Sequence, residues 1–156
     1  KLEPYSAKLR AREAKHSKFY FCDPGLVRSL KNKSGQVESE EMGPLFEGFI
    51  LHMLKAYQSY HKSIDDIFYW QPADAEKTEV DFLIRKGNSF CAIEVKSTNK
   101  IRPDDLKGLK AIDALKGLKR KILVYTGKDS QKLSGNIDVM NTSTFSQQLS
   151  KDELFR

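Results

Sequence analysis

The chain has 156 residues, of which 39% are hydrophobic, and a formal net charge of +6. This length and apolar content predict one folded domain of ordinary size and exclude wholesale disorder. No apolar run approaches the ~18 residues that a membrane-spanning helix needs, so we expect no membrane partner.

The first 40 residues are expected to form a basic extension before the core. Residues 5–17 are rich in Ala, Lys and Arg and are interpreted as a polar helix, and the aromatic run 18–21 as a short strand. A Pro-Gly turn signal precedes a short helix at 25–30, and a loop follows at 32–39. The chain begins without Met and without the apolar core of a secretory signal. We therefore expect this extension to be the remnant of an upstream segment.

From Pro44 to about Tyr60 the apolar residues recur with the 3.6-residue period of a helix. Proline suits the first helical turn, and the apolar arc is wide, so the helix is expected to be largely buried. Glu47 lies in its first turn, amid that arc. The apolar positions are Leu45, Phe46, Phe49, Ile50, Met53, Leu54 and Tyr57.

Three strand candidates come next. Ile67–Trp70 is aromatic and β-branched, and the segments 79–85 and 90–96 alternate between apolar and polar residues. A turn at 86–88 joins the last two into a predicted hairpin. In the segment 79–85, one face is expected to carry Glu79, Asp81, Leu83 and Arg85, and the other Val80, Phe82 and Ile84.

The remaining elements complete an α/β pattern. Pro103 and two Asp residues mark a helix start, and residues 121–125 read as a buried strand. A polar loop is expected at 126–136, a short strand at 137–140, and a tail at 141–156 that is interpreted as helical. The stripe of the helix after Pro103 consists of Leu106, Leu109, Ile112 and Leu115.

The order helix, strand, strand, strand, helix, strand predicts a mixed α/β core over residues 41–140, with a hairpin at its centre. Both cysteines, Cys22 and Cys91, lie in apolar stretches and are expected to be buried free thiols. Unpaired thiols favour a reducing compartment, and we expect a cytoplasmic protein.

Charge is divided unevenly along the chain. Residues 1–33 hold nine Lys or Arg against three Asp or Glu, residues 34–96 hold six against eleven, and residues 97–156 hold twelve against seven. An acidic centre between basic flanks fits a carboxylate site beside a polyanion-binding surface. Chance and loop solvation are the alternative, and charge alone leaves both open.

Four residues of the acidic centre form the candidate site. Glu94 and Lys96 are two apart on a strand, so both leave the same face, about 7 Å apart along it. The hairpin can bring Asp81 opposite Glu94, and the earlier helix must bring Glu47 to one face of the sheet. Carboxylates are the ligands that Mg²⁺ prefers, and a neighbouring lysine can stabilise charge at phosphorus. Solvated residues on the open face of a half-buried hairpin are the plainer interpretation.

The pattern Glu47, then Asp81, twelve residues, and Glu94-Val95-Lys96 resembles the PD-(D/E)XK nuclease superfamily. Five blocks in order also resemble the uncharacterised C-terminal domain of prokaryotic AAA-type ATPases. Val80 stands where the superfamily name implies Pro, and Gln71 where that family often has Arg. The blocks are KFYFCDPGLVRSL (18–30), GPLFEGFILHML (43–54), FYWQ (68–71), EVDFLI (79–84) and AIEVKST (92–98).

The resemblance implies a restriction-endonuclease-like fold and Mg²⁺-dependent hydrolysis of DNA, with Mn²⁺ as a substitute. It assigns Asp81 and Glu94 as metal ligands, Lys96 as the catalytic lysine, and Glu47 as an accessory catalytic and metal-binding carboxylate. Glu79 shares the face of Asp81, so its spacing suggests a supporting position beside the ligands. The resemblance also implies an upstream ATPase domain as a partner, and ATP would bind only there.

The basic flanks are the candidate DNA-binding surface, since lysine and arginine can neutralise phosphates without reading sequence. A solvated helix face is the alternative. Two other functions also stay open: a non-cleaving module that binds nucleic acid or protein and regulates the ATPase, and an assembly domain of a homo-oligomer. The candidate phosphate-binding residues are Lys8, Arg10, Arg12, Lys15, Lys18, Lys107 and Lys110.

Overall fold

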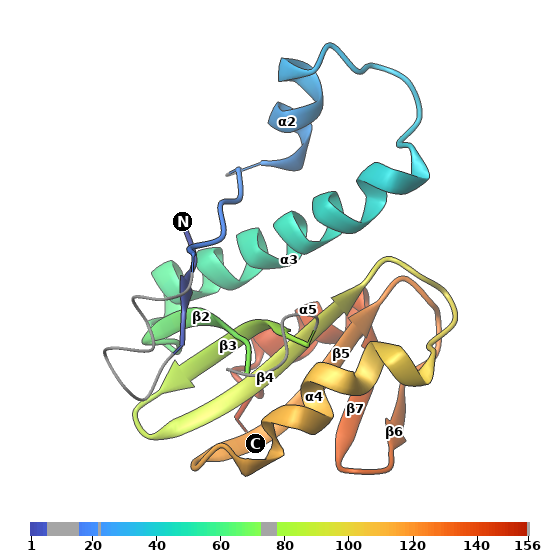
Figure 1. Cartoon of the computed structure of the whole chain (residues 1–156). Helices are drawn as coiled ribbons and strands as arrows, with labels where there is room; N and C mark the ends of the chain where they lie inside the picture. The colour runs from blue at the N-terminus through green and yellow to red at the C-terminus, as the bar shows by residue number, and fades with distance from the viewer. Residues whose placement is uncertain (6–15, 22, 73–77, 156) are drawn as a thin grey trace.

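The computed structural model describes residues 1–5, 16–21, 23–72 and 78–155. These residues form a mixed α/β fold, as the sequence predicts (Figure 1). Its elements are β1 (Glu3–Pro4), α2 (Pro24–Leu30), α3 (Ser39–His61), β2 (Asp66–Trp70), β3 (Val80–Lys86), β4 (Ser89–Lys96), the 3₁₀ turn η1 (Pro103–Leu106), α4 (Lys107–Ala111), the 3₁₀ turn η2 (Ile112–Ala114), β5 (Leu118–Tyr125), β6 (Gln131–Leu133), β7 (Ile137–Asn141) and α5 (Thr142–Ser150).

Seven strands of the described part form one sheet in the order β1-β2-β3-β4-β5-β7-β6. The central strands β2, β3 and β4 are antiparallel neighbours, whereas β4, β5 and β7 run parallel. A crossover through α4 makes the parallel β4–β5 pairing possible, because parallel neighbours cannot be joined by a tight turn. The hairpin predicted from the sequence is therefore the junction between the antiparallel and parallel halves.

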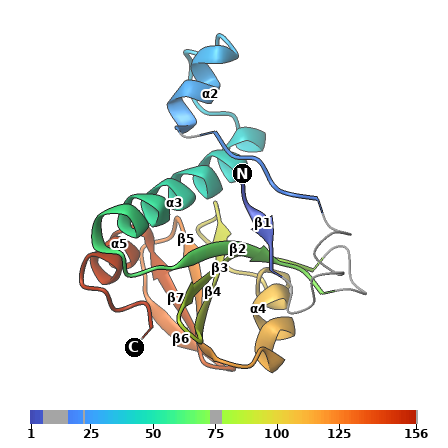
Figure 2. The ribbon, with the colours of Figure 1, turned by 90° about the vertical axis from the view of Figure 1, so that its left-hand side faces the viewer.

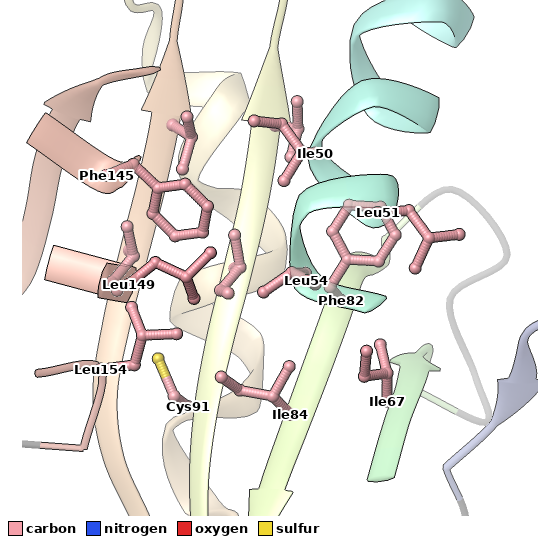
Figure 3. Packing of buried hydrophobic residues seen from close by; sticks show 14 of the residues in the cluster. Ile50, Leu51, Leu54, Ile67, Phe82, Ile84, Cys91, Phe145, Leu149 and Leu154 are labelled. Carbon is pink, nitrogen blue, oxygen red and sulfur yellow. The ribbon is translucent and has the colours of Figure 1, made fainter. Parts of the chain in front are cut away.

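The sheet is covered on both faces, with α3 and α5 on one side and α4 on the other (Figure 2). Figure 3 shows the first of these layers, an apolar cluster that includes Ile50 and Leu54 from α3, Phe145 from α5, and Phe82 and Ile84 of the hairpin. The α4 layer buries Leu106, Leu109 and Ile112 from the predicted apolar stripe. Successive side chains of a strand point to opposite faces of the sheet, so β4 contributes apolar residues to both layers.

The predicted helix start at Pro44 is wrong, because α3 already begins at Ser39. Pro44 lies inside the helix, where it deprives the Glu40 carbonyl of its usual donor. This loss occurs near the helix start and both residues are exposed, so water can bond the freed carbonyl. The helix end, at His61, lies one residue beyond the predicted one.

The C-terminal elements largely follow the prediction. The segment after Pro103 is helical, but as η1, α4 and η2 rather than one regular helix. The buried strand expected at 121–125 begins three residues earlier, and β7 and α5 lie where a strand and a helical tail are expected. The polar loop predicted at 126–136 contains the edge strand β6, which carries no apolar pattern.

The N-terminal extension is described only in part. The short helix α2 is confirmed, whereas the strand expected at 18–21 is limited to an isolated bridge between Lys18 and Leu2. Most of the helix predicted over 5–17 lies outside the described residues, as does Cys22. Cys91 is a buried free thiol, as predicted. Among the described helices, none is long and apolar enough to cross a membrane.

A register shift interrupts β3 where it enters the sheet. Phe68 of β2 pairs with Leu83 of β3, and Trp70 of β2 pairs with Val80 of β3. Two steps along β2 therefore correspond to three steps along β3. The extra residue in β3 is a β-bulge, a feature that re-aims side chains. Consequently Val80 packs with Leu83 in the α4 layer rather than with Phe82 and Ile84, which corrects the predicted alternation. Asp81 lies within this bulge.

Candidate functional site

Glu94 and Lys96 lie together at the end of β4, as their spacing predicts. Lys96 Nζ is 2.7 Å from Glu94 Oε1, and the Glu94 side chain is only 7% exposed. Lys96 is a third exposed, so it forms the solvent-facing side of the pair. A buried carboxylate beside a partly exposed ammonium is the first part of the site.

Asp81 lies against the same end of β4. The β3–β4 ladder ends at the pair Phe82 and Ile93, and beyond it the Val95 N–H donates to Asp81 Oδ2 at 2.9 Å. The Asp81 side chain therefore accepts a hydrogen bond from a backbone N–H of β4, just beyond the last backbone pair of the two strands. Only 2% of Asp81 is exposed. The bulge in β3 and this hydrogen bond hold the Asp81 carboxylate beside that of Glu94.

Glu47 reaches the site from α3, where it is partly buried. The Tyr20 hydroxyl donates to Glu47 Oε2 at 3.2 Å, and the Tyr20 ring contacts Phe82 at a centroid distance of 6.0 Å. Tyr20 is a site residue that the sequence did not reveal, because the contact joins residues 27 positions apart. The aromatic run at 18–21 was the one available signal, and it predicted a strand.

Lys18 and Glu79 form a second ion pair at the edge of the site. Lys18 Nζ lies 2.7 Å from Glu79 Oε1 and 5.1 Å from the centroid of the Tyr69 ring. The negative charge of Glu79 helps to raise the pKa of both Glu47 and Glu94, so the three carboxylates lie near one another. Glu79 and its partner Lys18 therefore lie near the carboxylates, and a supporting role of Glu79 stays a prediction.

Burial is the main cause of the electrostatic character of this site. It raises the pKa of Glu94 to about 7, although Lys96 acts in the opposite direction. It also raises the pKa of Asp81 well above the usual value, and repulsion from Glu94 and Glu47 adds to this. Burial alone would lower the pKa of Lys96, but the Glu94 carboxylate reverses the effect, so the pKa is raised. The site thus keeps a cation next to carboxylates that are reluctant to ionise.

The carboxylate pair fits a hard divalent cation. Glu94 Oε2 is buried and has no hydrogen-bond partner among the described residues, which is a costly arrangement for a charged oxygen. A cation that binds both Asp81 and Glu94 would satisfy this oxygen and relieve the repulsion between the two groups. One or two carboxylates are the usual protein share of an Mg²⁺ site.

Within the described residues, no group of three or more His, Cys, Asp or Glu side chains is arranged to hold a metal ion. The case for metal binding therefore depends on the pair Asp81 and Glu94. Glu47 is engaged by Tyr20, and its assignment as a third ligand stays a prediction.

The predicted phosphate-binding residues are only partly placed. Lys107 and Lys110 lie exposed on α4, and Lys107 pairs with Asp104 at 3.1 Å. The negative charge of Asp105, two residues before Lys107, helps to raise the pKa of Lys96. The start of this segment therefore lies near the site. Lys18 is held in its ion pair with Glu79, and the remaining candidates, Lys8, Arg10, Arg12 and Lys15, lie outside the described residues.

Fold and site together define a mixed α/β domain with a buried carboxylate pair and a lysine at the end of its central hairpin. The model of a family described as a domain of unknown function, DUF4143, matches residues 42–145, about two thirds of the chain. The chain belongs to this family. The match includes most of α3 and all of the central hairpin, and therefore Glu47, Asp81, Glu94 and Lys96.

Among solved structures, the chain is similar to protein VC1899 from Vibrio cholerae. The two are 22% identical, with a TM-score of 0.46, over 75% of this chain and 34% of that one. This chain thus spans about a third of the length of that protein. No curated protein sequence matches.

Proposed function

We propose that this domain is a metal-dependent nuclease of the PD-(D/E)XK type, which hydrolyses DNA phosphodiester bonds and is joined to an AAA-type ATPase in the intact protein. One observation carries the proposal: two buried carboxylates, Asp81 and Glu94, lie beside Lys96, and Glu94 Oε2 has no hydrogen-bond partner within the part of the chain that the structure describes. A purely structural role explains this poorly, because a buried carboxylate oxygen without a hydrogen-bond partner, next to a second buried carboxylate, destabilises a fold.

Each residue then has a definite role. Asp81 and Glu94 would hold Mg²⁺, and Glu47, fixed by Tyr20, would act as the accessory carboxylate. When bound, Mg²⁺ supplies charge neutralisation at the phosphate and a more acidic nucleophilic water. Lys96 stays cationic, because Glu94 raises its pKa, and it is placed to stabilise negative charge that develops on the phosphate oxygens.

The test is DNA cleavage in the presence of millimolar Mg²⁺. We expect the wild-type domain to cut DNA, and Lys96→Ala and Asp81→Asn to reduce the rate by about 100-fold or more, the size typical of losing one transition-state contact. Circular dichroism should show that both variants are folded. Lys55→Ala, which removes an exposed lysine of α3, is the matched control and should cut normally.

The proposal fails if the purified wild-type domain neither cuts DNA nor binds Mg²⁺ or Mn²⁺. Equal rates for Lys96→Ala and Lys55→Ala would assign any activity to another site or to a contaminant.

A second candidate is a non-cleaving module that regulates or assembles the ATPase. It is favoured by the apolar surface of α2, where Leu26 and Leu30 are 43% and 64% exposed. Exposed apolar residues that gather on one element often mark a protein-binding surface. Loss of ATPase coupling in Leu30→Ala of the intact protein, without any nuclease activity in the wild type, would favour this candidate.

A further inference from the structure

A small apolar pocket lies between residues 19–21 and the N-terminal half of α3. Its volume is about 170 Å³, and α2 contributes part of its wall. Figure 1 shows how α2 stands out from the body of the domain above α3. The lining includes Phe19, Tyr20, Phe21, Val27, Leu45 and Glu47.

Two of the lining aromatic residues are largely exposed to solvent. Phe19 is 77% exposed and Phe21 is 58% exposed. Between them, Tyr20 packs inward against Phe82 and bonds Glu47. Leaving two phenylalanine rings in water forfeits roughly 1.5–3 kcal/mol of burial energy for each, which favours a ligand that covers them.

The size of the pocket limits what can enter it. An apolar cavity of about 150 Å³ in another protein holds one benzene molecule. A pocket of about 170 Å³ therefore accepts one planar ring system, and it is too small for a helix or a folded segment.

The pocket and the candidate site share a wall. Glu47 lines the pocket, and its charge acts on Asp81. A group bound in the pocket would thus lie next to the place where the proposed hydrolysis occurs. Lys18, the residue before Phe19, provides a cation at the same edge.

The chemistry of the lining selects among planar ligands. The carboxylate of Glu47 repels a phosphate group, but it can accept hydrogen bonds from the N–H groups on the edge of a heterocycle. The phenylalanine rings offer faces for stacking. A nucleobase has both an aromatic face and N–H edges, whereas the phosphate attached to it would stay outside, near Lys18 and Lys96.

We propose that this pocket binds one unpaired nucleobase of the strand that the domain cuts, so that the substrate is single-stranded DNA or a locally unpaired end. The inference depends on the proposed nuclease function, since it names the substrate of the same site. In a duplex the faces and edges of a base are covered by its neighbours and its partner, and a base can enter such a pocket only when it is unpaired.

The inference is tested by binding alone, without metal. Lys96→Ala protein in EDTA is titrated with single-stranded DNA that carries 2-aminopurine, whose fluorescence falls when it stacks on an aromatic ring. We expect quenching, and about tenfold weaker binding after Phe19→Ala or Phe21→Ala, since one stacked base contributes about 1–3 kcal/mol and 1.4 kcal/mol is tenfold. Tyr60→Ala is the matched control, because this aromatic residue is 83% exposed near the C-terminal end of α3 and does not line the pocket.

The outcomes separate this inference from the function on which it depends. Equal affinity of Phe19→Ala and Tyr60→Ala, or cleavage of duplex in preference to single strands, overturns the base pocket and leaves the nuclease proposal intact. Quenching that depends on Phe19 and Phe21, without cleavage by the wild type, supports the pocket and overturns hydrolysis. A wild-type dimer that Phe19→Ala converts to monomer, without quenching, would assign the pocket to a second copy of this chain and overturn the inference.

Discussion

At the scale of single residues, the site is defined by what burial does to charge. Glu94 titrates near neutral pH, because its carboxylate is buried on β4, and the Lys96 ammonium only partly offsets that burial. Asp81 is shifted in the same direction. At neutral pH and above, the ionised carboxylates of the metal-free site therefore lower the stability of the fold, and a bound cation can offset this cost.

This leads to a prediction for metal-free protein. Between about pH 4.5 and 7 the folded Glu94 carboxyl keeps a proton that the unfolded chain has lost, so the free energy of unfolding should fall as pH rises. The fall from Glu94 should amount to roughly 3 kcal/mol at most. Urea unfolding at about pH 5 and about pH 8 measures it.

Glu94→Gln should reduce this pH dependence and leave the part that comes from Asp81, whereas Glu40→Gln, at an exposed position of α3, should leave it unchanged. Millimolar Mg²⁺ should raise the melting temperature of the wild type more at about pH 8 than at about pH 5, because protons compete for the carboxylates. A stability that rises with pH in this range, or an Mg²⁺ effect that survives in Glu94→Gln, would contradict the assignment.

Sequence patterns predicted part of the site and missed part of it, for reasons that lie in the residues themselves. Glu94 and Lys96 are two positions apart on one strand, so their proximity follows from strand geometry alone. Tyr20 meets Glu47 across 27 positions, through a segment that forms no regular strand, so no local period indicates it. Likewise, the ion pair of Lys18 with Glu79 joins positions 61 apart.

At the scale of elements, the position of Asp81 depends on how α4 packs against the entry to β3. Gly108 in α4 is buried, and a Cβ at this position would overlap the backbone carbonyl oxygen of Glu79, two residues before Asp81. The close approach of this helix to the strand entry requires glycine. It also couples the α4 layer to the bulge that aims Asp81.

Gly108→Ala should therefore destabilise the domain by about 1–3 kcal/mol, the usual cost of overpacking, although alanine is the better helix former. It should also reduce nuclease activity by more than the loss of folded protein explains. Gly43→Ala is the control, since a Cβ at that helical position would meet only Ser97 Oγ at 3.7 Å. Urea unfolding of both variants measures the difference, and equal stability would argue against the coupling.

The strands whose apolar residues follow a clear pattern were predicted from the sequence, whereas the edge strand β6, which has no such pattern, was not. The alternation of the hairpin strands and the buried run of β5 locate three central strands, because apolar spacing reflects which face is covered. The exposed edge strand β6 has the sequence Gln-Lys-Leu and a single partly buried residue, so no such signal exists. The bulge at Val80 breaks a regular alternation, and only the pairing with β2 reveals it.

At the scale of the whole molecule, the net charge of +6 is the difference between an acidic centre and two basic flanks. The structure gives the centre a physical meaning, since Asp81 and Glu94 are its buried members and Lys96 lies at its border. The C-terminal flank includes the exposed Lys107 and Lys110 on α4. If this helix faces bound DNA, part of the affinity must be electrostatic and must depend on salt.

We expect Lys107→Gln with Lys110→Gln to weaken single-stranded DNA binding uniformly across sequences and to lower the slope of log affinity against log salt by about 1.4, since each phosphate contact contributes about 0.7. Lys55→Gln with Lys62→Gln removes the same charge from the C-terminal half of α3 and from the residue that follows it, and is the matched control. Lys55 and Lys62 follow Glu47 by 8 and 15 positions, or roughly 12 and 22 Å along the helix direction, so this pair should change the slope less than the pair on α4. Binding measured by fluorescence anisotropy over a series of salt concentrations distinguishes the two faces. Equal slopes for both double variants would mean that only the overall charge matters, and that α4 has no specific place in the DNA-binding surface.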